Sequence, residues 1–126
     1  MLNAKRFMSE ISRGDREWRF DVDDMIGFAE KARAYTIGLS QSSFVEDQRT
    51  FDATLRNLEL IGEAATHIPD SVRLAHPEIP WRLVIATRTR LIHGYLGIDN
   101  DTLWGIIEDD VPTLISSLHE LKKDYL

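Results

Sequence analysis

An apolar side chain recurs every seven residues through the middle of the chain, and this repeat restricts the fold more than any other feature. Its members are Phe44, Phe51, Leu58 and Ala65. A stripe with this spacing is typical of a helix that packs at a shallow angle in a bundle. We predict one helix over about residues 43–67, ended by Pro69. No segment alternates apolar and polar residues as a strand does, so an all-α fold is predicted.

Three further segments have helical spacing. The first runs over about residues 21–36, with Asp21 as N-cap and Gly38 after its end. It would bury the apolar residues Met25, Phe28, Ala29, Ala32 and Leu39. The second runs over about 80–93, after a short polar turn, and Gly94 is its natural C-terminal cap.

The last helix is predicted to begin at a cap formed by Asn100 or Asp101. Pro112 lies inside it and must kink it or split it in two, because proline removes one backbone donor and clashes with the preceding turn. The predicted fold is an up-and-down bundle of four to five helices with short connections. Residues 20–126 would form one domain, and residues 1–19, which show no clear period, an N-terminal arm.

Composition excludes several classes of protein. The chain has no cysteine, which rules out a disulfide framework and a thiolate metal site and agrees with a reducing compartment. No window approaches the roughly 20 apolar residues of a membrane span, and the first residues lack the apolar core of a signal peptide. We therefore expect a cytoplasmic protein with no membrane partner.

Positive charge is concentrated in one segment of an acidic chain. The net charge is −6, yet between Glu78 and Asp99 lie Arg82, Arg88 and Arg90 and no acidic residue. The remainder, with 12 basic and 21 acidic residues, carries −9. An average charge of this sign argues against a protein that coats nucleic acid, but the segment itself predicts a local cationic patch.

Arg88 is misplaced for an ordinary bundle helix. On a helical wheel, the predicted buried stripe consists of Trp81, Val84, Ile85, Leu91 and Ile92, and Arg88 lies in the middle of it. A guanidinium there needs an anion, because it cannot lose its proton. One interpretation is an ion pair with Glu59 or Glu63 of the preceding helix. The other is a bidentate grip on a phosphate.

His93 lies in the last turn of the same predicted helix. The helix dipole favours its charged form there, and an imidazole can exchange a proton near neutral pH. A purely structural histidine is the alternative. Arg88 and His93 are about 140 degrees apart on an ideal helix, so within one chain they converge only if the arginine curls round or the helix loosens at Gly94.

The segment "RTRLIHGY" (88–95) resembles the R-x4-6-H motif of HEPN-domain ribonucleases, and with Tyr95 the R-x4-H-x-Y motif of HepT toxins. Further blocks resemble that family in the same order along the chain: "DATLRNLELIGEAA" (52–65), "PEIPWR" (77–82), "LIHGYLGID" (91–99) and "LWGIIEDDVPTL" (103–114). The resemblance covers about residues 20–120. It implies a HEPN-like bundle and the toxin component of a type VII (HEPN/MNT) toxin–antitoxin system.

The resemblance also implies an activity, a metal-independent endoribonuclease that works at a cleft between two protomers of a homodimer. Arg88 would neutralise the scissile phosphate, and His93 would act as general base or acid in attack by the adjacent 2′-hydroxyl. Thr89, Arg90 and Arg82 would support these residues or bind RNA. The position after the motif arginine is commonly asparagine in the family and is Thr89 here, which offers one donor instead of two.

By the same resemblance, Tyr95 is the residue to which an MNT-type nucleotidyltransferase antitoxin attaches AMP. Bulky anionic nucleotides beside Arg88 and His93 would occupy the place of the RNA phosphate. Without the resemblance, Tyr95 would be interpreted as an anchor of its turn. The alternative class of function is a non-catalytic HEPN module that binds a nucleotide or the nucleotidyltransferase through the same arginine and histidine.

The remaining histidines predict no cofactor. Glu59, Glu63 and His67 recur every four residues, but the paired Glu-x-x-His pattern of di-metal bundles is absent, so no metal site is predicted. His76, beside Pro77, and His119 are expected at the surface.

Overall fold

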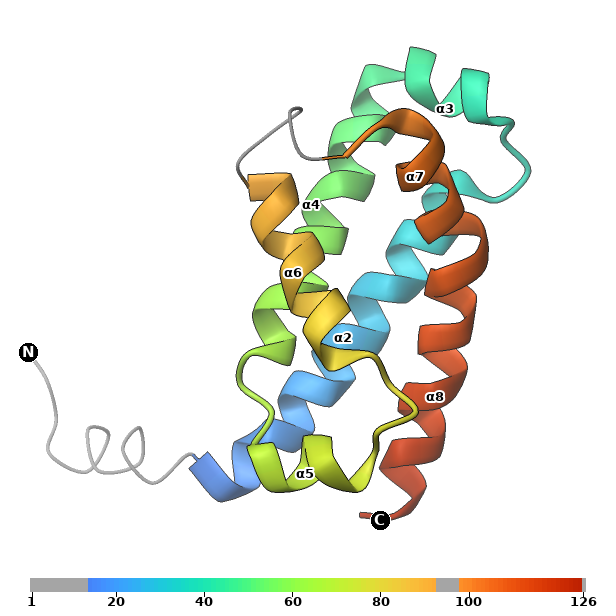
Figure 1. Ribbon diagram of the computed structural model, residues 1–126. Coiled ribbons are helices and arrows are strands. Elements are labelled where there is room, and N and C mark those ends of the chain that lie inside the picture. Colours follow the sequence, from blue (N-terminus) through green and yellow to red (C-terminus); the bar gives the residue numbers. More distant parts are fainter. Residues whose placement is uncertain (1–13, 93–97, 126) are drawn as a thin grey trace, which may run out of the picture.

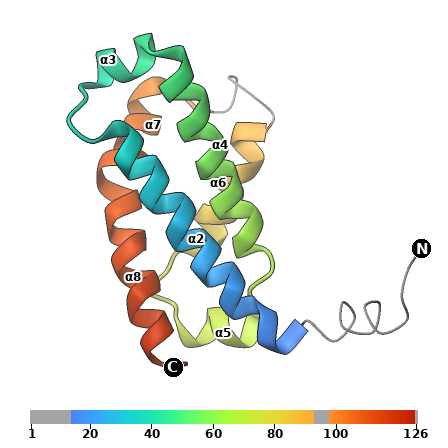
Figure 2. The same ribbon diagram turned by 180° about the vertical axis from the view of Figure 1, so that it is seen from behind.

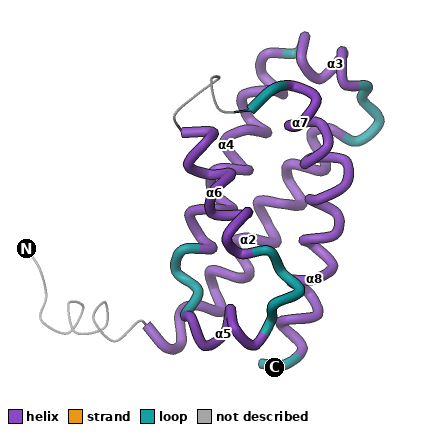
Figure 3. Tube along the Cα trace, in the orientation of Figure 1, coloured by secondary structure: helices purple, strands orange, loops and turns teal. Residues whose placement is uncertain are grey.

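The computed structural model describes residues 14–92 and 98–125, with side chains from Trp18 onward. In these ranges every regular element is helical (Figure 3). The elements are α2 (Gly14–Thr36), α3 (Gln41–Glu46), α4 (Gln48–Ala65), α5 (Asp70–Ala75), α6 (Trp81–Ile92), α7 (Asn100–Gly105), the π-helix η1 (Ile106–Asp110) and α8 (Val111–Lys123). The predicted all-α bundle is confirmed.

Four longer helices form the body of the bundle, and the short ones lie at its two ends (Figures 1 and 2). Helix α2 packs against α4 and α8, whereas α6 packs chiefly against α4. The central side chains are fully enclosed, as shown by Met25 and Leu118, each 0% exposed. Helix α6 is therefore an edge helix of the bundle, covered mainly on the side that faces α4.

Helix α2 begins seven residues before the predicted N-cap, at Gly14, so the start assigned to Asp21 was wrong. The apolar face continues toward the N-terminus through Val22 and Trp18, which are both buried. The ring of Trp18 meets that of Tyr125 edge to face, with centroids 4.7 Å apart. This contact joins the first described turn to the C-terminal end of the chain. The helix ends at Thr36, and Gly38 follows its end as predicted, with a φ of +81°.

The predicted helix over residues 43–67 is two helices, so its continuity was wrong. Asp47 separates α3 from α4 and caps α4: its carboxylate accepts from the Thr50 hydroxyl at 2.8 Å and from the Thr50 backbone N–H at 3.2 Å. These two hydrogen bonds hold the pKa of the Asp47 carboxyl below its usual value. The cap satisfies donors that a continuous helix would have paired internally, which stabilises the break. Phe44 of α3 is still buried.

The polar turn predicted between the second and third helices contains the short helix α5, and the histidine after it is buried. His76 is 7% exposed and not at the surface as expected. Its two ring nitrogens face Glu78 at 3.1 Å and Asp124 at 3.3 Å, and its backbone carbonyl accepts from the Trp81 indole at 3.0 Å. Carboxylate partners make burial of the ring possible and tie the start of α6 to the end of α8. His119, as predicted, is exposed.

The last predicted helix is split, as Pro112 required. Asp99 is its N-cap, one residue before the predicted Asn100, and accepts from the Thr102 backbone N–H at 2.7 Å. That hydrogen bond and the Thr102 hydroxyl lower the pKa of Asp99. Between α7 and α8 the chain widens into η1, and the N–H of Val111 reaches back to the carbonyl of Ile106. A π-turn here relieves the clash of the proline ring with the preceding turn.

Candidate functional site

Helix α6 carries the cationic segment and buries less of itself than the wheel predicted. Trp81 and Leu91 are 7% and 9% exposed, and Val84 and Ile85 are partly buried against the core. Ile92, placed in the buried stripe by the sequence, is 53% exposed, so that assignment was wrong. The helical wheel predicted that neighbouring helices cover a wide side of α6. Because α6 lies at the edge of the bundle, α4 covers only a narrow strip of it.

Gly62 sets the distance between α6 and α4. A Cβ atom added there would overlap the Cβ of Arg88 and lie 3.0 Å from the carbonyl oxygen of Val84. Both atoms belong to α6: one is a backbone oxygen and the other is the first side-chain atom of Arg88. Neither can move aside as the end of a flexible side chain can. The absence of a side chain at Gly62 therefore lets the stem of Arg88 lie directly against α4.

The guanidinium of Arg88 forms an ion pair with α4. Its Nη2 lies 2.8 Å from Oε2 of Glu63, so of the two carboxylates proposed from the sequence the structure selects Glu63. The pair is not sealed: 31% of the Arg88 side chain and 47% of the Glu63 side chain are exposed. The Nε of Arg88 is buried, and no acceptor among the described residues lies within hydrogen-bonding distance of it. The guanidinium is held at one point and remains reachable from solvent.

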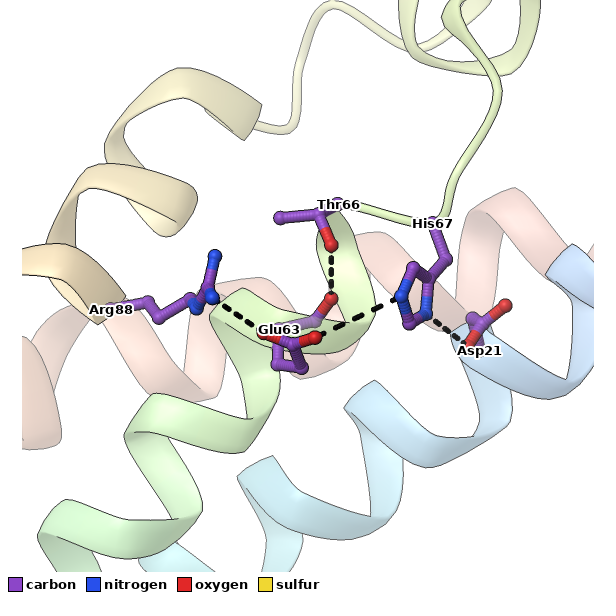
Figure 4. A network of polar contacts seen from close by, with 5 residues as sticks. All are labelled: Asp21, Glu63, Thr66, His67 and Arg88. Carbon is purple, nitrogen blue, oxygen red and sulfur yellow. Dashed lines mark hydrogen bonds and ion pairs between the residues drawn. The ribbon is translucent and has the colours of Figure 1, made fainter. Parts of the chain in front are cut away.

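The ion pair continues into a chain of polar contacts that crosses from α6 through α4 to α2 (Figure 4). Oε1 of Glu63 lies 3.9 Å from Nε2 of His67, and Nδ1 of His67 lies 3.2 Å from Oδ1 of Asp21. The contact between His67 and Asp21 was not predicted from the sequence, because 46 residues separate the two partners.

The residues predicted to support the motif have different neighbours. Arg82, Thr89 and Arg90 are all exposed on α6. Arg82 borders a hollow between α5 and α6, together with Arg73 and Leu74. The charge of Arg90 contributes to the lowered pKa of Asp99, after the Thr102 hydrogen bonds. Of the predicted site residues that the structure describes, Arg88 contacts Glu63 of α4.

His93 and Tyr95 lie outside the described residues, as does Gly94. The convergence of His93 with Arg88, and the position of Tyr95 beside them, therefore stay predictions. Helix α6 is described up to Ile92, and the described part of the chain resumes at Ile98.

The three residues weighed as metal ligands are engaged in ion pairs. Glu59 accepts from Arg56 at 3.2 Å, while Glu63 and His67 belong to the chain that ends at Asp21. Among the residues that the structure describes, no group of three or more histidine and acidic side chains is arranged to hold a metal ion. Nor does any described helix have the length and apolar character needed to cross a bilayer.

Comparison with known proteins places the chain in a family. The family described as "Ribonuclease HepT-like" matches residues 25–121, which include α4, α6, α7 and the motif segment 88–95. The chain therefore belongs to the HepT-like ribonuclease family. No solved structure gives a significant match.

Individual relatives are similar over most of their length. A protein of Thermococcus cleftensis named "Probable ribonuclease HepT" is 34% identical over 113 residues, which are 90% of this chain and 100% of the relative. A "Putative RNase" of Methanocaldococcus jannaschii is 34% identical over 71% of this chain and 74% of its own. Another, from Caldanaerobacter subterraneus, is 34% identical over 67% and 75%.

Proposed function

We propose that this protein is a metal-independent endoribonuclease and the toxin of a type VII (HEPN/MNT) toxin–antitoxin system, acting in the cytoplasm. The observation that carries the proposal is the state of Arg88. The motif arginine lies on an edge helix with about a third of its side chain exposed, instead of being enclosed in the core. An accessible guanidinium is what a phosphate ligand requires. The family and the names of its relatives supply the substrate class, RNA.

The proposed reaction needs only groups that the chain provides. His93 accepts the proton of the 2′-hydroxyl, and the 2′-oxygen attacks the adjacent phosphorus while the bond to the 5′-oxygen breaks. The leaving 5′-oxygen takes up a proton, and the products are a 2′,3′-cyclic phosphate and a 5′-hydroxyl. Arg88 neutralises the charge that builds on the phosphate. Thr89, Arg90 and Arg82 hold the neighbouring RNA backbone.

A homodimer completes this scheme. One motif histidine per chain supplies one of the two proton-transfer groups, and a two-fold interface would bring the second from the other copy. Edge helix α6 leaves Leu83 and Ile92 67% and 53% exposed, as suits a surface that a second copy covers.

The experiment that tests the activity uses purified protein freed of any modification and a single-stranded RNA oligonucleotide. We expect cleavage to continue in excess EDTA and to yield 2′,3′-cyclic phosphate and 5′-hydroxyl ends. A 2′-deoxy nucleotide at the scissile position should block it, because the attacking oxygen is gone. Cleavage that requires a divalent cation, or that leaves 5′-phosphate ends, would contradict the proposed mechanism.

We further propose that an MNT-type nucleotidyltransferase neutralises the protein by attaching AMP to Tyr95. An added AMP carries negative charge that would compete with RNA for Arg88. Intact-mass measurement after co-expression with the partner should show discrete steps of one AMP each, and these should be missing in Tyr95→Phe. Tyr35→Phe, which changes an exposed tyrosine of helix α2, is the control and should keep them. Persistence of the steps in Tyr95→Phe would reassign the modified residue.

A further inference from the structure

In this structure a carboxylate already contacts the guanidinium of Arg88, the group that we propose to bind phosphate. Oε2 of Glu63 lies 2.8 Å from Nη2 of Arg88, where a phosphate oxygen would accept the same hydrogen bond. We infer that Glu63 is the resting counter-ion of Arg88, which an RNA phosphodiester displaces when it binds. The inference rests on the proposed function, and it makes Glu63 a residue that sets the affinity for RNA.

The pair is built so that it can be exchanged. Both side chains are partly exposed, and exposed ion pairs are weakly held because water and salt screen them. The contact is made at one guanidinium nitrogen, while Nε finds no acceptor among the described residues. Phosphate oxygens form charge-assisted hydrogen bonds with arginine as carboxylates do, so the exchange replaces one anion with another of similar strength.

A second partner lies close to the displaced carboxylate. Oε1 of Glu63 already lies 3.9 Å from Nε2 of His67, and the opposite nitrogen of that ring faces Asp21 at 3.2 Å. A ring nitrogen that carries a proton can donate a hydrogen bond to a carboxylate. Figure 4 shows Glu63 between Arg88 and His67. Release from Arg88 therefore leaves Glu63 beside His67 instead of unpaired.

The chain contains a matched control. Glu59 lies one helical turn before Glu63 on α4 and forms an ion pair with Arg56 at 3.2 Å, not with Arg88. Glu59→Gln and Glu63→Gln remove the same charge from the same helix. A general change in the electrostatic field of the protein would alter RNA binding by both variants. The removal of a competitor for Arg88 would alter RNA binding by Glu63→Gln alone.

The test measures binding and cleavage separately. The affinity probe is a single-stranded RNA oligonucleotide with 2′-O-methyl groups throughout, which cannot be cleaved, and anisotropy at fixed ionic strength gives the Kd. We expect Glu63→Gln to lower the Kd about fivefold and Glu59→Gln to change it by less than about twofold. With cleavable RNA, Glu63→Gln should lower KM by a similar factor and leave kcat within about twofold of the unmodified chain. Adding Arg88→Ala to Glu63→Gln should remove the gain.

His67→Ala provides a second variant that does not alter the ion pair itself. Without His67, Glu63 loses its alternative partner, so the Kd should rise by about twofold, and the rise should vanish in the Glu63→Gln background. Circular dichroism verifies that each variant is folded.

The outcomes separate this inference from the proposed function. Unchanged or weaker RNA binding by Glu63→Gln, or a fall in kcat at constant Kd, would overturn the counter-ion role and make Glu63 a structural support of Arg88. Tighter, Arg88-dependent binding by a chain that never cleaves RNA would uphold the counter-ion and reject the nuclease.

Discussion

Replacing Arg88 by alanine should lower kcat/KM for RNA cleavage by at least about 100-fold, the usual cost of removing a group that stabilises developing charge. His93→Ala should cause a loss of similar size, because the 2′-hydroxyl then lacks its proton acceptor. The fold should survive Arg88→Ala, since the Glu63 carboxylate left behind is 47% exposed and can be hydrated. Thermal unfolding and cleavage kinetics on the same preparation separate the two effects.

Arg56→Ala is the matched control for charge. It removes an arginine that is 67% exposed and that also pairs with a glutamate of α4, so it should leave cleavage close to that of the unmodified chain. Equal losses in Arg56→Ala and Arg88→Ala would reduce Arg88 to a general electrostatic contribution. If the unmodified chain leaves RNA intact while Arg88→Ala and His93→Ala still abolish nucleotide binding, the protein is the non-catalytic binding module.

Replacing Gly62 by alanine should lower the free energy of unfolding by about 1–3 kcal/mol, as overpacking does at a close contact. The new methyl group would overlap the Cβ of Arg88 and press on the backbone of Val84, so α6 must move away from α4. That movement also shifts the root of Arg88, and we expect activity to fall together with stability. Denaturant unfolding measures the first and RNA cleavage the second.

Gly27→Ala is the corresponding control. Gly27 lies inside α2, and nothing lies within 4 Å of an added Cβ. The better helix propensity of alanine should raise stability there by up to about 1 kcal/mol. If Gly62→Ala raised the free energy of unfolding as much as Gly27→Ala does, the close approach of α6 to α4 would not depend on glycine at position 62.

The sequence predicted the helices well wherever a long apolar period decides the matter. The stripe through α4, the glycine that ends α2 and the break that Pro112 demands in the last helix were all found, because each follows from a rule about one segment. Helix starts were harder. A regular period passes through Asp47 without interruption, and only the observed cap shows that local hydrogen bonding wins there.

The site was predictable in its residue types but not in its connections. The position of Arg88 on an apolar stripe predicted that its guanidinium needs an anion. Helical spacing alone did not decide whether Glu59 or Glu63 is that anion. The choice depends on how α6 is placed along α4, which Gly62 determines through tertiary contact. The burial of His76 and the exposure of Ile92 were missed for the same reason, since each depends on which neighbouring element covers it.

Edge placement of α6 separates the residues that keep the protein folded from those that we propose to bind RNA. None of the fully enclosed side chains that the structure describes belongs to α6, which contributes Trp81 and Leu91 to the margin of the core. Substitutions on the outward side of this helix should therefore cost little in folding, while the three-helix scaffold of α2, α4 and α8 stays the same. Descendants of one ancestral chain can in this way acquire different targets without first evolving a new architecture.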